Sequence, residues 1–236
     1  MSPKEFLDTV LTAFFPRRCP YCGTVLTPEE RICKDCLAHL PRIEEPRCPY
    51  CGASKKDCCC HKRQRYFTCV LAPFYYEDAA RKAIERYKFQ NKPFLASALA
   101  KDMARTVTDH VPLAEVDCIT YVPFTKKQKK EREFNPSEAL ARALAKELSM
   151  PCEPLLLKLY ETKTQHLLSK EDRKGNVLGV FDVAPHADVQ NKSILLVDDI
   201  KTTGSTLSEC AKMLVLGDAK AVYCATFAIA HYTKKK

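Results

Sequence analysis

Apolar residues recur at the three- and four-residue spacing of amphipathic helices in several stretches of the chain. Asn135 or Ser137 has the kind of side chain that opens a helix. Leu207, Ala211 and Leu214 form a further helical stripe near the C-terminus. The pattern therefore predicts helices over residues 78–89, 94–107 and 136–148, and a fourth helix that carries the stripe.

Short apolar runs between these helices have the length of buried strands. Strands separated by helices form a parallel sheet with helices on its faces. The pattern therefore predicts an α/β fold in the larger, C-terminal part of the chain. The expected strands cover residues 117–124, 155–159 and 194–197 and part of 221–230.

The first residues read as a separate helix. Ser2 to Glu5 form a capping box with proline at the first helical position, and apolar residues then recur at helical spacing as far as Pro16. A cysteine-rich segment with many turn residues follows. The expected organisation is an amphipathic helix over 1–17, a cysteine module over 18–70 and the α/β domain over 71–236.

Composition narrows the class of protein. The chain has 236 residues, of which 46% are hydrophobic and 28% charged, and no apolar run approaches the roughly 18 residues of a membrane span. Its N-terminus lacks the pattern of a secretory signal, so we expect a cytosolic protein. The net charge of +9 indicates an anionic partner.

Nine of the fourteen cysteines fall before residue 61, which in a reducing compartment favours metal binding over disulfides. The first group consists of two close pairs, Cys19 with Cys22 and Cys33 with Cys36. Each pair presents two thiolates to one point, as tetrahedral zinc requires. We expect a structural zinc ion here, because four thiolates leave no open coordination position.

A second group begins with Cys48 and Cys51, a near-copy of the first pair. Its closing half is "DCCCHK", in which three thiols and one imidazole compete for two places. Cys58 and Cys60 are the favoured ligands, with Cys59 or His61 as substitutes. The sequence therefore predicts one or two structural zinc ions.

Stretch 194–206, "ILLVDDIKTTGST", runs from an apolar strand into two acids and a hydroxyl-rich turn. A turn that leads into a helix near Ser205 places backbone N–H groups at a helix N-terminus, which binds phosphate. Gly204 lets the backbone approach an anion closely. Asp198 and Asp199 can accept hydrogen bonds from vicinal hydroxyls or hold a divalent ion. The stretch thus has adjacent groups for phosphate and for sugar.

The sequence excludes two other phosphate-binding motifs. The chain has six glycines and contains neither GxxxxGK[ST] nor GxGxxG, which argues against a P-loop and a dinucleotide fingerprint.

"VDDIKTTGST" resembles the phosphoribosyl-pyrophosphate (PRPP) motif of type I phosphoribosyltransferases. Three further segments make the chain similar to the ComF family, which is linked to natural competence and the use of external DNA. These are "YYEDAARKAIERYKFQNKPFLASALA", "VPFTKKQKKEREFNPSEALARALAKEL" and "TKTQHLLSKEDRKGNVLGVF". The chain departs from the family pattern at Pro136, where glutamine is usual, and at Leu167, where glycine is usual.

The resemblance implies a type I phosphoribosyltransferase-like domain behind a zinc-ribbon module, with Mg²⁺ accompanying PRPP. It implies that the two acids hold the ribose hydroxyls and that the turn holds the 5-phosphate. It assigns no catalytic residue. The residues expected to bind PRPP are Asp198, Asp199, Lys201, Thr202, Thr203, Gly204, Ser205 and Thr206. The residues expected near the pyrophosphate or in the segment that covers the ligand are Val122, Pro123, Arg132, Gln165, Ser169, Arg173 and Asn176.

A basic stretch follows the Val-Pro pair. It is either a solvated face or a clamp for pyrophosphate or a nucleic-acid backbone. Nearby aromatic residues offer stacking surfaces for single-stranded bases, or core contacts. The expected nucleic-acid contacts are Lys126, Lys127, Lys129 and Lys130.

The leading functional hypothesis is a phosphoribosyltransferase-domain protein that binds PRPP or a related ribose phosphate and takes part in handling incoming single-stranded DNA. A competence helicase or another DNA-processing protein is the expected protein partner. One alternative is a non-catalytic adaptor for DNA or protein with a vestigial PRPP site. The other is a nucleotide-salvage transferase. Spacing does not specify the acceptor.

Overall fold

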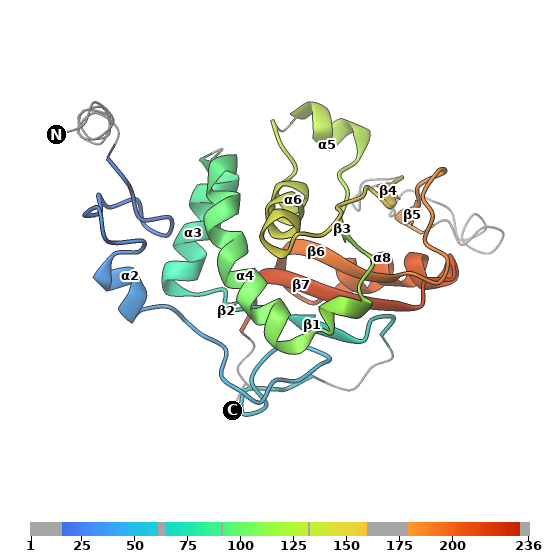
Figure 1. Ribbon diagram of the computed structural model, residues 1–236, viewed down its shortest axis with the longest axis horizontal. Coiled ribbons are helices and arrows are strands. Elements are labelled where there is room, and N and C mark those ends of the chain that lie inside the picture. The colour runs from blue at the N-terminus through green and yellow to red at the C-terminus, as the bar shows by residue number, and fades with distance from the viewer. Residues whose placement is uncertain (1–15, 61–64, 91, 132, 160–178, 232–236) are drawn as a thin grey trace, which may run out of the picture.

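A computed structural model describes residues 16–60, 65–90, 92–131, 133–159 and 179–231 (Figure 1). Its centre is a five-stranded parallel sheet in which β1, β7, β6 and β3 lie in that order and β2 pairs with the far end of β7. The strands are β1 (Cys69–Leu71), β2 (Phe74–Tyr75), β3 (Cys118–Tyr121), β6 (Ser193–Lys201) and β7 (Ala221–Ile229).

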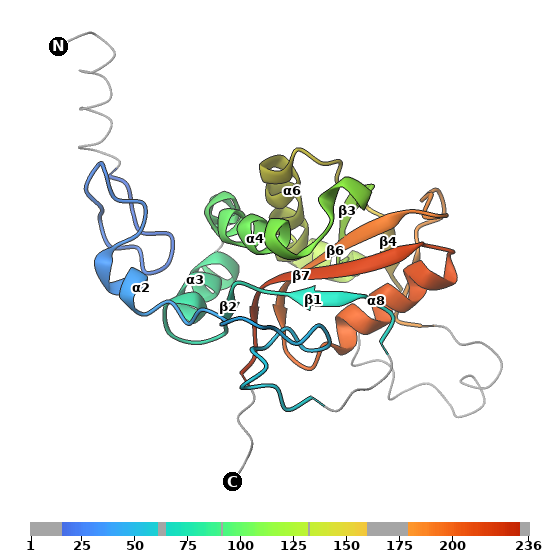
Figure 2. The same cartoon turned by 60° about the horizontal axis from the view of Figure 1, so that its bottom comes forward.

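The central strands are buried on both faces, as expected for a parallel sheet covered by helices. In β6, Leu195 and Val197 pack into the core shared with three helices, whereas Ile194 and Leu196 pack into the core on the other side. Figure 2 shows α4 and α6 on one side of the sheet and α8 on the other. The covering helices are α3 (Asp78–Phe89), α4 (Ala96–His110), α6 (Pro136–Leu148) and α8 (Ser205–Leu216).

The helical pattern in the sequence is confirmed. Helix α6 has the predicted bounds because local signals fix its start: the Asn135 side chain accepts a hydrogen bond from the Ser137 N–H at 3.1 Å, and Pro136 holds the first helical position. Helix α4 begins two residues later than predicted, after a short 3₁₀ turn over Pro93–Leu95, and runs on to His110. The remaining short helices are α2 (Lys34–Ala38), η2 (Leu113–Glu115) and α5 (Lys126–Glu131).

One expected strand lies outside the main sheet. β4 (Leu156–Lys158) pairs antiparallel with β5 (Phe181–Val183) in a separate two-stranded sheet. The preceding residues already line the edge of β3, since the Ile119 N–H donates to the Pro151 carbonyl and the Glu153 N–H donates to the Ile119 carbonyl, each at 2.9 Å. The chain then leaves β3 and forms β4 of the separate sheet.

The two halves of the cysteine-rich segment dock at different places. Near the first cysteines, Arg86 of α3 donates to the carbonyls of Cys19 and Pro20, and the Tyr21 hydroxyl donates to Asp102 of α4. The second half lies against the edge strands, where the Val70 N–H of β1 donates to the Pro49 carbonyl at 3.0 Å. Side-chain and backbone contacts therefore join both halves to the sheet domain.

Two further sequence-based expectations concern the N-terminal helix and membrane-spanning segments. The predicted N-terminal helix over 1–17 lies outside the described residues apart from its last two positions. Within the described part of the chain, no helix combines the length and apolarity needed to span a bilayer.

Candidate functional site

The candidate site lies where the connections between parallel strands change sides. Helix α6, which follows β3 and the short α5, covers one face of the sheet, and α8, which follows β6, covers the other. Ligands of open α/β sheets bind outside the carboxyl ends of the strands at such a switch point. β3 and β6 are neighbours with Tyr121 opposite Val197, so the residues that follow each of them share this edge.

Asp198 lies at this edge with two hydrogen-bond donors. Its Oδ1 accepts from the Ser137 hydroxyl at 2.8 Å and from the Asp199 N–H at 2.9 Å. Burial and, next, the neighbouring Asp199 carboxylate raise the pKa of Asp198, which reaches about 7 although the Ser137 hydrogen bond lowers it. Near neutral pH this carboxyl can therefore either donate or accept a hydrogen bond.

Asp199 has its partner on a different helix, α3. It is 7% exposed, and its Oδ2 lies 2.7 Å from the Lys88 ammonium. Its other oxygen accepts from the Ile200 N–H at 2.6 Å. The two adjacent acids thus have different environments, one next to a hydroxyl and one next to a cation.

The strand does not end at the acids, as the apolar run suggested. β6 continues through them to Lys201, with Asp198 opposite Thr226 and Lys201 opposite Ile229 of β7. The cause lies outside the local sequence, because the long neighbour β7 supplies ladder partners for eight of the nine residues of β6, all except Asp199. Both acids therefore lie within the strand and not in a loop, with Asp198 paired to Thr226.

The hydroxyl-rich turn connects β6 to α8. Gly204 has φ +83°, a conformation that favours glycine, and α8 begins at the next residue. The Thr203 and Ser205 hydroxyl oxygens lie 2.9 Å apart, and the Ser205 N–H donates to Thr203 Oγ1. Four side chains of the turn are exposed, namely those of Thr202, Thr203, Ser205 and Thr206. Hydroxyls and helix N-terminal N–H groups are therefore available to an anion.

Lys201 differs from the other members of the turn because it is 5% exposed. Its ammonium donates to the Thr202 carbonyl at 3.4 Å. Burial lowers the pKa of Lys201. An ideal Cβ on Gly204 would lie 3.0 Å from both Lys201 Cε and Arg65 Nη1, so these two cationic side chains meet at the turn.

The Val-Pro pair stands beside the acids across the switch point. The Val122 N–H donates to the Val197 carbonyl at 3.0 Å, and the Asn135 amide donates to the Val122 carbonyl at 3.1 Å. Val122 and Pro123 are both buried. The segment after β3 is thus fixed by backbone and side-chain hydrogen bonds next to Asp198.

The basic stretch forms helix α5, which Figure 1 shows projecting beyond α6. Lys127 and Lys130 are exposed, and Lys127 lies 3.7 Å from Glu131 of the same helix. The backbone of Lys126 and Lys129 belongs to this helix as well. The other expected site residues lie outside the described residues, and they are Arg132, Gln165, Ser169, Arg173 and Asn176.

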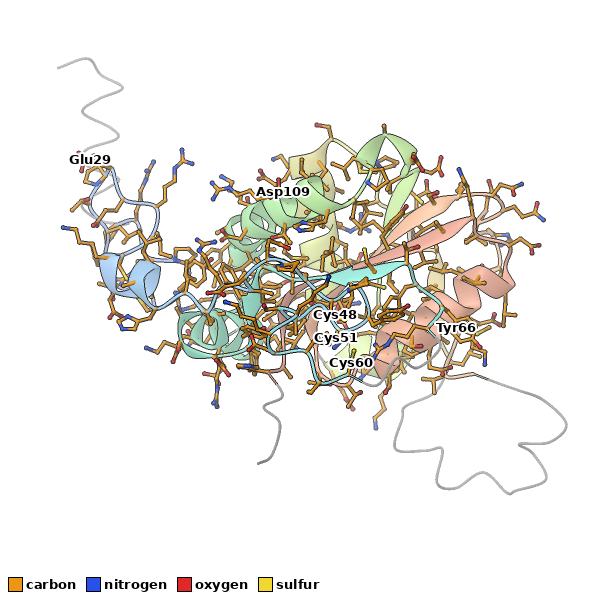
Figure 3. All side chains as sticks on the ribbon, turned by 90° about the horizontal axis from the view of Figure 1, so that it is seen from below. Glu29, Cys48, Cys51, Cys60, Tyr66 and Asp109 are labelled. Carbon is orange, nitrogen blue, oxygen red and sulfur yellow. The ribbon has the colours of Figure 1, made fainter. Side chains whose placement is uncertain are left out.

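The described residues contain two groups of four cysteines. Within each group, all four sulfur atoms lie within 4.8 Å of one another. Four sulfur atoms bound tetrahedrally to zinc, each about 2.3 Å from the ion, would lie about 3.8 Å from one another. The observed Sγ–Sγ distances are close to this: 3.7 Å between Cys48 and Cys60, and 3.7 Å between Cys51 and Cys58. Figure 3 shows three thiols of the second group at one place. The groups are Cys19, Cys22, Cys33 and Cys36, and Cys48, Cys51, Cys58 and Cys60.

Residues 10–67 match the double zinc ribbon domain family. Together with the two four-cysteine groups, this match supports structural Zn²⁺ in the N-terminal module. DNA utilization protein YhgH of Escherichia coli (strain K12) is 30% identical over 204 residues, which are 81% of this chain and 87% of the relative.

The chain belongs to the ComF family. Competence protein F of Haemophilus influenzae is 27% identical, covering 85% of this chain and 92% of the relative. Competence protein ComFC of Bacillus subtilis is 26% identical, covering 87% and 86%. The ComF resemblance read from the four sequence segments is therefore confirmed.

Solved structures also include chains similar to this one. The glutamine PRPP amidotransferase of B. subtilis is similar, with 22% identity and a TM-score of 0.41. The match covers 56% of this chain and 25% of that chain. The purine phosphoribosyltransferase of Pyrococcus horikoshii matches 59% of this chain with 18% identity and a TM-score of 0.36. The predicted fold class, a parallel α/β sheet with flanking helices behind a zinc-ribbon module, is confirmed.

Three residues of the site were not predicted from the sequence. Lys88, Ser137 and Arg65 each reach the acids or the turn from a distant part of the chain. Lys88 and Ser137 lie within two of the segments that resemble the ComF family. This resemblance is the one feature of the sequence that could have indicated them. Arg65 lies near the end of the cysteine module, after its last cysteine group, in a stretch without any motif.

Proposed function

We propose that this ComF-family protein binds PRPP or a related ribose phosphate, with Mg²⁺, at the switch point between β3 and β6. The observation that carries the proposal is the placement of two acids and an exposed hydroxyl turn at the carboxyl end of β6. A sugar phosphate needs carboxylates for vicinal hydroxyls and an N–H and hydroxyl cradle for the phosphate, and one stretch of nine residues supplies both.

Each part of the ligand has a matching part of the site. The 5-phosphate occupies the turn from Thr202 to Thr206, at the N-terminus of α8. The ribose hydroxyls donate to Asp198 and Asp199. The pyrophosphate lies towards Val122 and Pro123, on the β3 side of the switch point.

The oxygen donors of Asp198 and Asp199 suit Mg²⁺, which prefers carboxylate, water and phosphate oxygens. When bound, Mg²⁺ would neutralise charge on the pyrophosphate group. Lys88 provides a second positive charge at the same place, since it lies 2.7 Å from Asp199. The site therefore balances its own acids and those of the ligand with a small number of cations.

The reaction class that fits such a ligand is transfer of the ribose phosphate to an acceptor. The acceptor's lone pair forms a bond to the anomeric carbon, the bond from that carbon to the pyrophosphate oxygen breaks, and pyrophosphate leaves with the electron pair. Positioning and charge stabilisation would supply the rate enhancement. The alternative is a site that binds ribose phosphate without turnover, as part of an adaptor.

Release of pyrophosphate separates these two alternatives. Purified protein would be incubated with PRPP, Mg²⁺ and each of a panel of bases, nucleosides and single-stranded DNA. Turnover predicts acceptor-dependent release that is lost in the variant with both Asp198→Asn and Asp199→Asn. If PRPP binds but no acceptor elicits release, the adaptor is correct; if PRPP does not bind, the proposed function is wrong.

We also propose that the protein takes part in handling incoming single-stranded DNA. The names of its relatives, competence proteins and DNA utilization proteins, support this role. Helix α5 offers the complementary surface: it carries four lysines in six residues and projects from the sheet domain near the site. A competence helicase or another DNA-processing protein is the partner that would deliver or receive the strand.

A further inference from the structure

The phosphate turn has two cationic side chains against it, the buried Lys201 and the partly buried Arg65, and they come from different parts of the chain. Lys201 ends β6, whereas Arg65 precedes β1. Both side chains lie against the α-carbon of Gly204. A Cβ atom at this position would be 3.0 Å from Lys201 Cε and 3.0 Å from Arg65 Nη1. In the described part of the chain, neither side chain forms an ion pair with an Asp or Glu residue. Two like charges at one buried place need a counter-charge from another source.

Arg65 shows the same shortage in its hydrogen bonds. Its Nε is buried and has no partner among the described residues, and its guanidinium lies over the Phe67 ring at 5.5 Å. A buried N–H without an acceptor costs free energy comparable to a lost hydrogen bond. The arrangement is therefore incomplete without a neighbouring anionic group.

The second four-cysteine group is the anionic neighbour. It lies beside the end of β6: Lys201 is opposite Ile229 of β7, Ile229 is opposite Tyr75 of β2, and Cys51 packs against the cluster that contains Tyr75 and Ile229. Burial lowers the pKa of Lys201, and the thiols of Cys51, Cys60 and Cys48 act in the opposite direction. Four thiolates around Zn²⁺ carry a net charge of −2, which would balance the two cations. The first group has no such relation to the turn, and Figure 3 shows Glu29, from the first half of the module, well apart from the second group.

The second half of the module is also held to β1 and β2, which pair with β7, the strand next to β6. An ideal Cβ on Gly52 would lie 3.0 Å from the Val70 carbonyl oxygen of β1. The Tyr75 hydroxyl of β2 donates to Asp57 at 2.6 Å and accepts from the Ser54 N–H at 3.0 Å. A change at this metal group would consequently be transmitted to the sheet edge as well as to Lys201.

We propose that the second four-cysteine group positions the phosphate turn: its metal-bound thiolates hold Lys201 and Arg65 against Gly204, so that anion binding by the turn depends on this metal and not on the first. The inference rests on the proposed function. It assigns different roles to two groups with the same ligands. The first attaches the N-terminal ribbon to α3 and α4, and the second supports the ligand site.

The test compares matched variants of the full chain, Cys51→Ser in the second group and Cys22→Ser in the first. Zinc per chain should fall from about two to about one in each. Ribose 5-phosphate affinity, measured by titration calorimetry, should fall at least about tenfold in Cys51→Ser and stay within about twofold of wild type in Cys22→Ser. Equal affinities in the two variants, or a larger loss in Cys22→Ser, would overturn the inference.

Variants that keep all eight thiols show whether weaker binding arises without loss of zinc or unfolding. Lys201→Met and Arg65→Met should retain about two zinc ions and still bind ribose 5-phosphate more weakly, whereas Lys212→Met on α8 should not. The double variant Cys51→Ser with Lys201→Met should lose no more affinity than whichever single variant binds ribose 5-phosphate more weakly. Additive losses would mean that Lys201 acts on the phosphate independently of the metal group, against the inference.

Hydrogen exchange separates failure of this inference from failure of the proposed function. If wild type binds neither ribose 5-phosphate nor PRPP, the proposed function fails. The amides of residues 202–206 still report on the turn, and they should lose protection in Cys51→Ser and keep it in Cys22→Ser. Unchanged protection in both variants would contradict the positioning role whatever the ligand result.

Discussion

The Lys88 ammonium of α3 lies 2.7 Å from Asp199 Oδ2 of β6, and both side chains are largely buried, at 20% and 10% exposed. The pair joins a helix of the ComF sequence segment "YYEDAARKAIERYKF" to the acids of the ribose-phosphate motif. It means that one of the two acids has its own counter-charge within the protein, while the other is held by a hydroxyl.

Loss of this pair should destabilise the protein. Lys88→Met leaves Asp199 buried beside Asp198 without a cation, and breaking a buried pair costs on the order of 3 kcal/mol. The free energy of unfolding, measured by urea denaturation with zinc present, should fall by about that amount.

The same helix offers a matched control. Arg81 lies 2.8 Å from Glu85, but this pair is exposed, and such pairs contribute at most about 1 kcal/mol. Arg81→Met should therefore have little effect on the free energy of unfolding. Equal losses in Lys88→Met and Arg81→Met would show that Lys88 has no special role.

Ligand binding should depend on pH through Asp198. The folded protein favours the protonated form, because burial raises the pKa from 3.8 to about 7. Mg²⁺ and the carboxylate interact only after the proton has left, so Mg²⁺-dependent PRPP affinity should rise as the pH increases through about 7. Between about pH 6 and pH 8 the ionised fraction of a group with this pKa rises about tenfold.

The pH dependence can be assigned by comparison with Asp198→Asn, which has no proton to lose. PRPP itself also titrates, and this part is common to both proteins. Titrations of each at several pH values should show the additional rise only in wild type, whose Asp198 faces Ser137, Asp199 and Lys88. Parallel pH curves for the two proteins would count against this role of Asp198.

Gly204 should be required for the phosphate turn. Its φ of +83° disfavours any other residue, and a Cβ would come within 3.0 Å of Arg65 and Lys201. Gly23 is a matched control in the first ribbon, with φ +90° and a Cβ position 3.0 Å from Arg86. Gly204→Ala and Gly23→Ala should each cost about 1 kcal/mol of stability, measured by denaturation.

Only the first of these two glycine variants should weaken ribose 5-phosphate binding, because only Gly204 belongs to the turn. Calorimetric titration of both variants checks this difference. If Gly204→Ala binds as wild type does, the turn is not the phosphate site.

The lysines of α5 should make the binding of single-stranded DNA sensitive to salt. Each phosphate contact contributes about −0.7 to the slope of log affinity against log salt for single strands. Replacing Lys126, Lys127, Lys129 and Lys130 by Ala should weaken binding and make the slope less steep by up to about 3. Fluorescence anisotropy with a labelled oligonucleotide at several salt concentrations measures both quantities.

Exposed lysines elsewhere provide the control for net charge. Lys101 on α4 and Lys220 before β7 are both exposed. Their replacement by Ala should reduce affinity much less than the α5 replacements do. The assignment of α5 as the contact surface would be wrong if the two sets of variants had similar slopes.

Local patterns in the sequence predicted a large part of the fold. Helices α3 and α6 were predicted with their observed bounds, because helical periodicity and the Asn135–Pro136 start signal depend only on nearby residues. Strands β1, β2 and β5 were not predicted, since two or three residues are too few to show a period. β6 was predicted too short because the two acids interrupt the apolar run, while pairing with β7 continues to Lys201.

The site was predictable to the extent that it is contiguous. The acids and the turn lie in one stretch of sequence, so they could be read directly. Lys88, Ser137 and Arg65 approach them only through packing of α3, of the start of α6 and of the segment before β1. Spacing along the chain contains no information on such contacts. The relation between the second cysteine group and the turn has the same origin.

Titration calorimetry with PRPP and Mg²⁺ tests the central claim most directly. Wild type should bind PRPP at about one site per chain with a saturable heat. The variant with both Asp198→Asn and Asp199→Asn should keep its zinc content and lose this binding by at least about a hundredfold, about 2.7 kcal/mol. No binding by wild type, or equal binding by the double variant, would contradict the assignment of this edge of the sheet as a ribose-phosphate site.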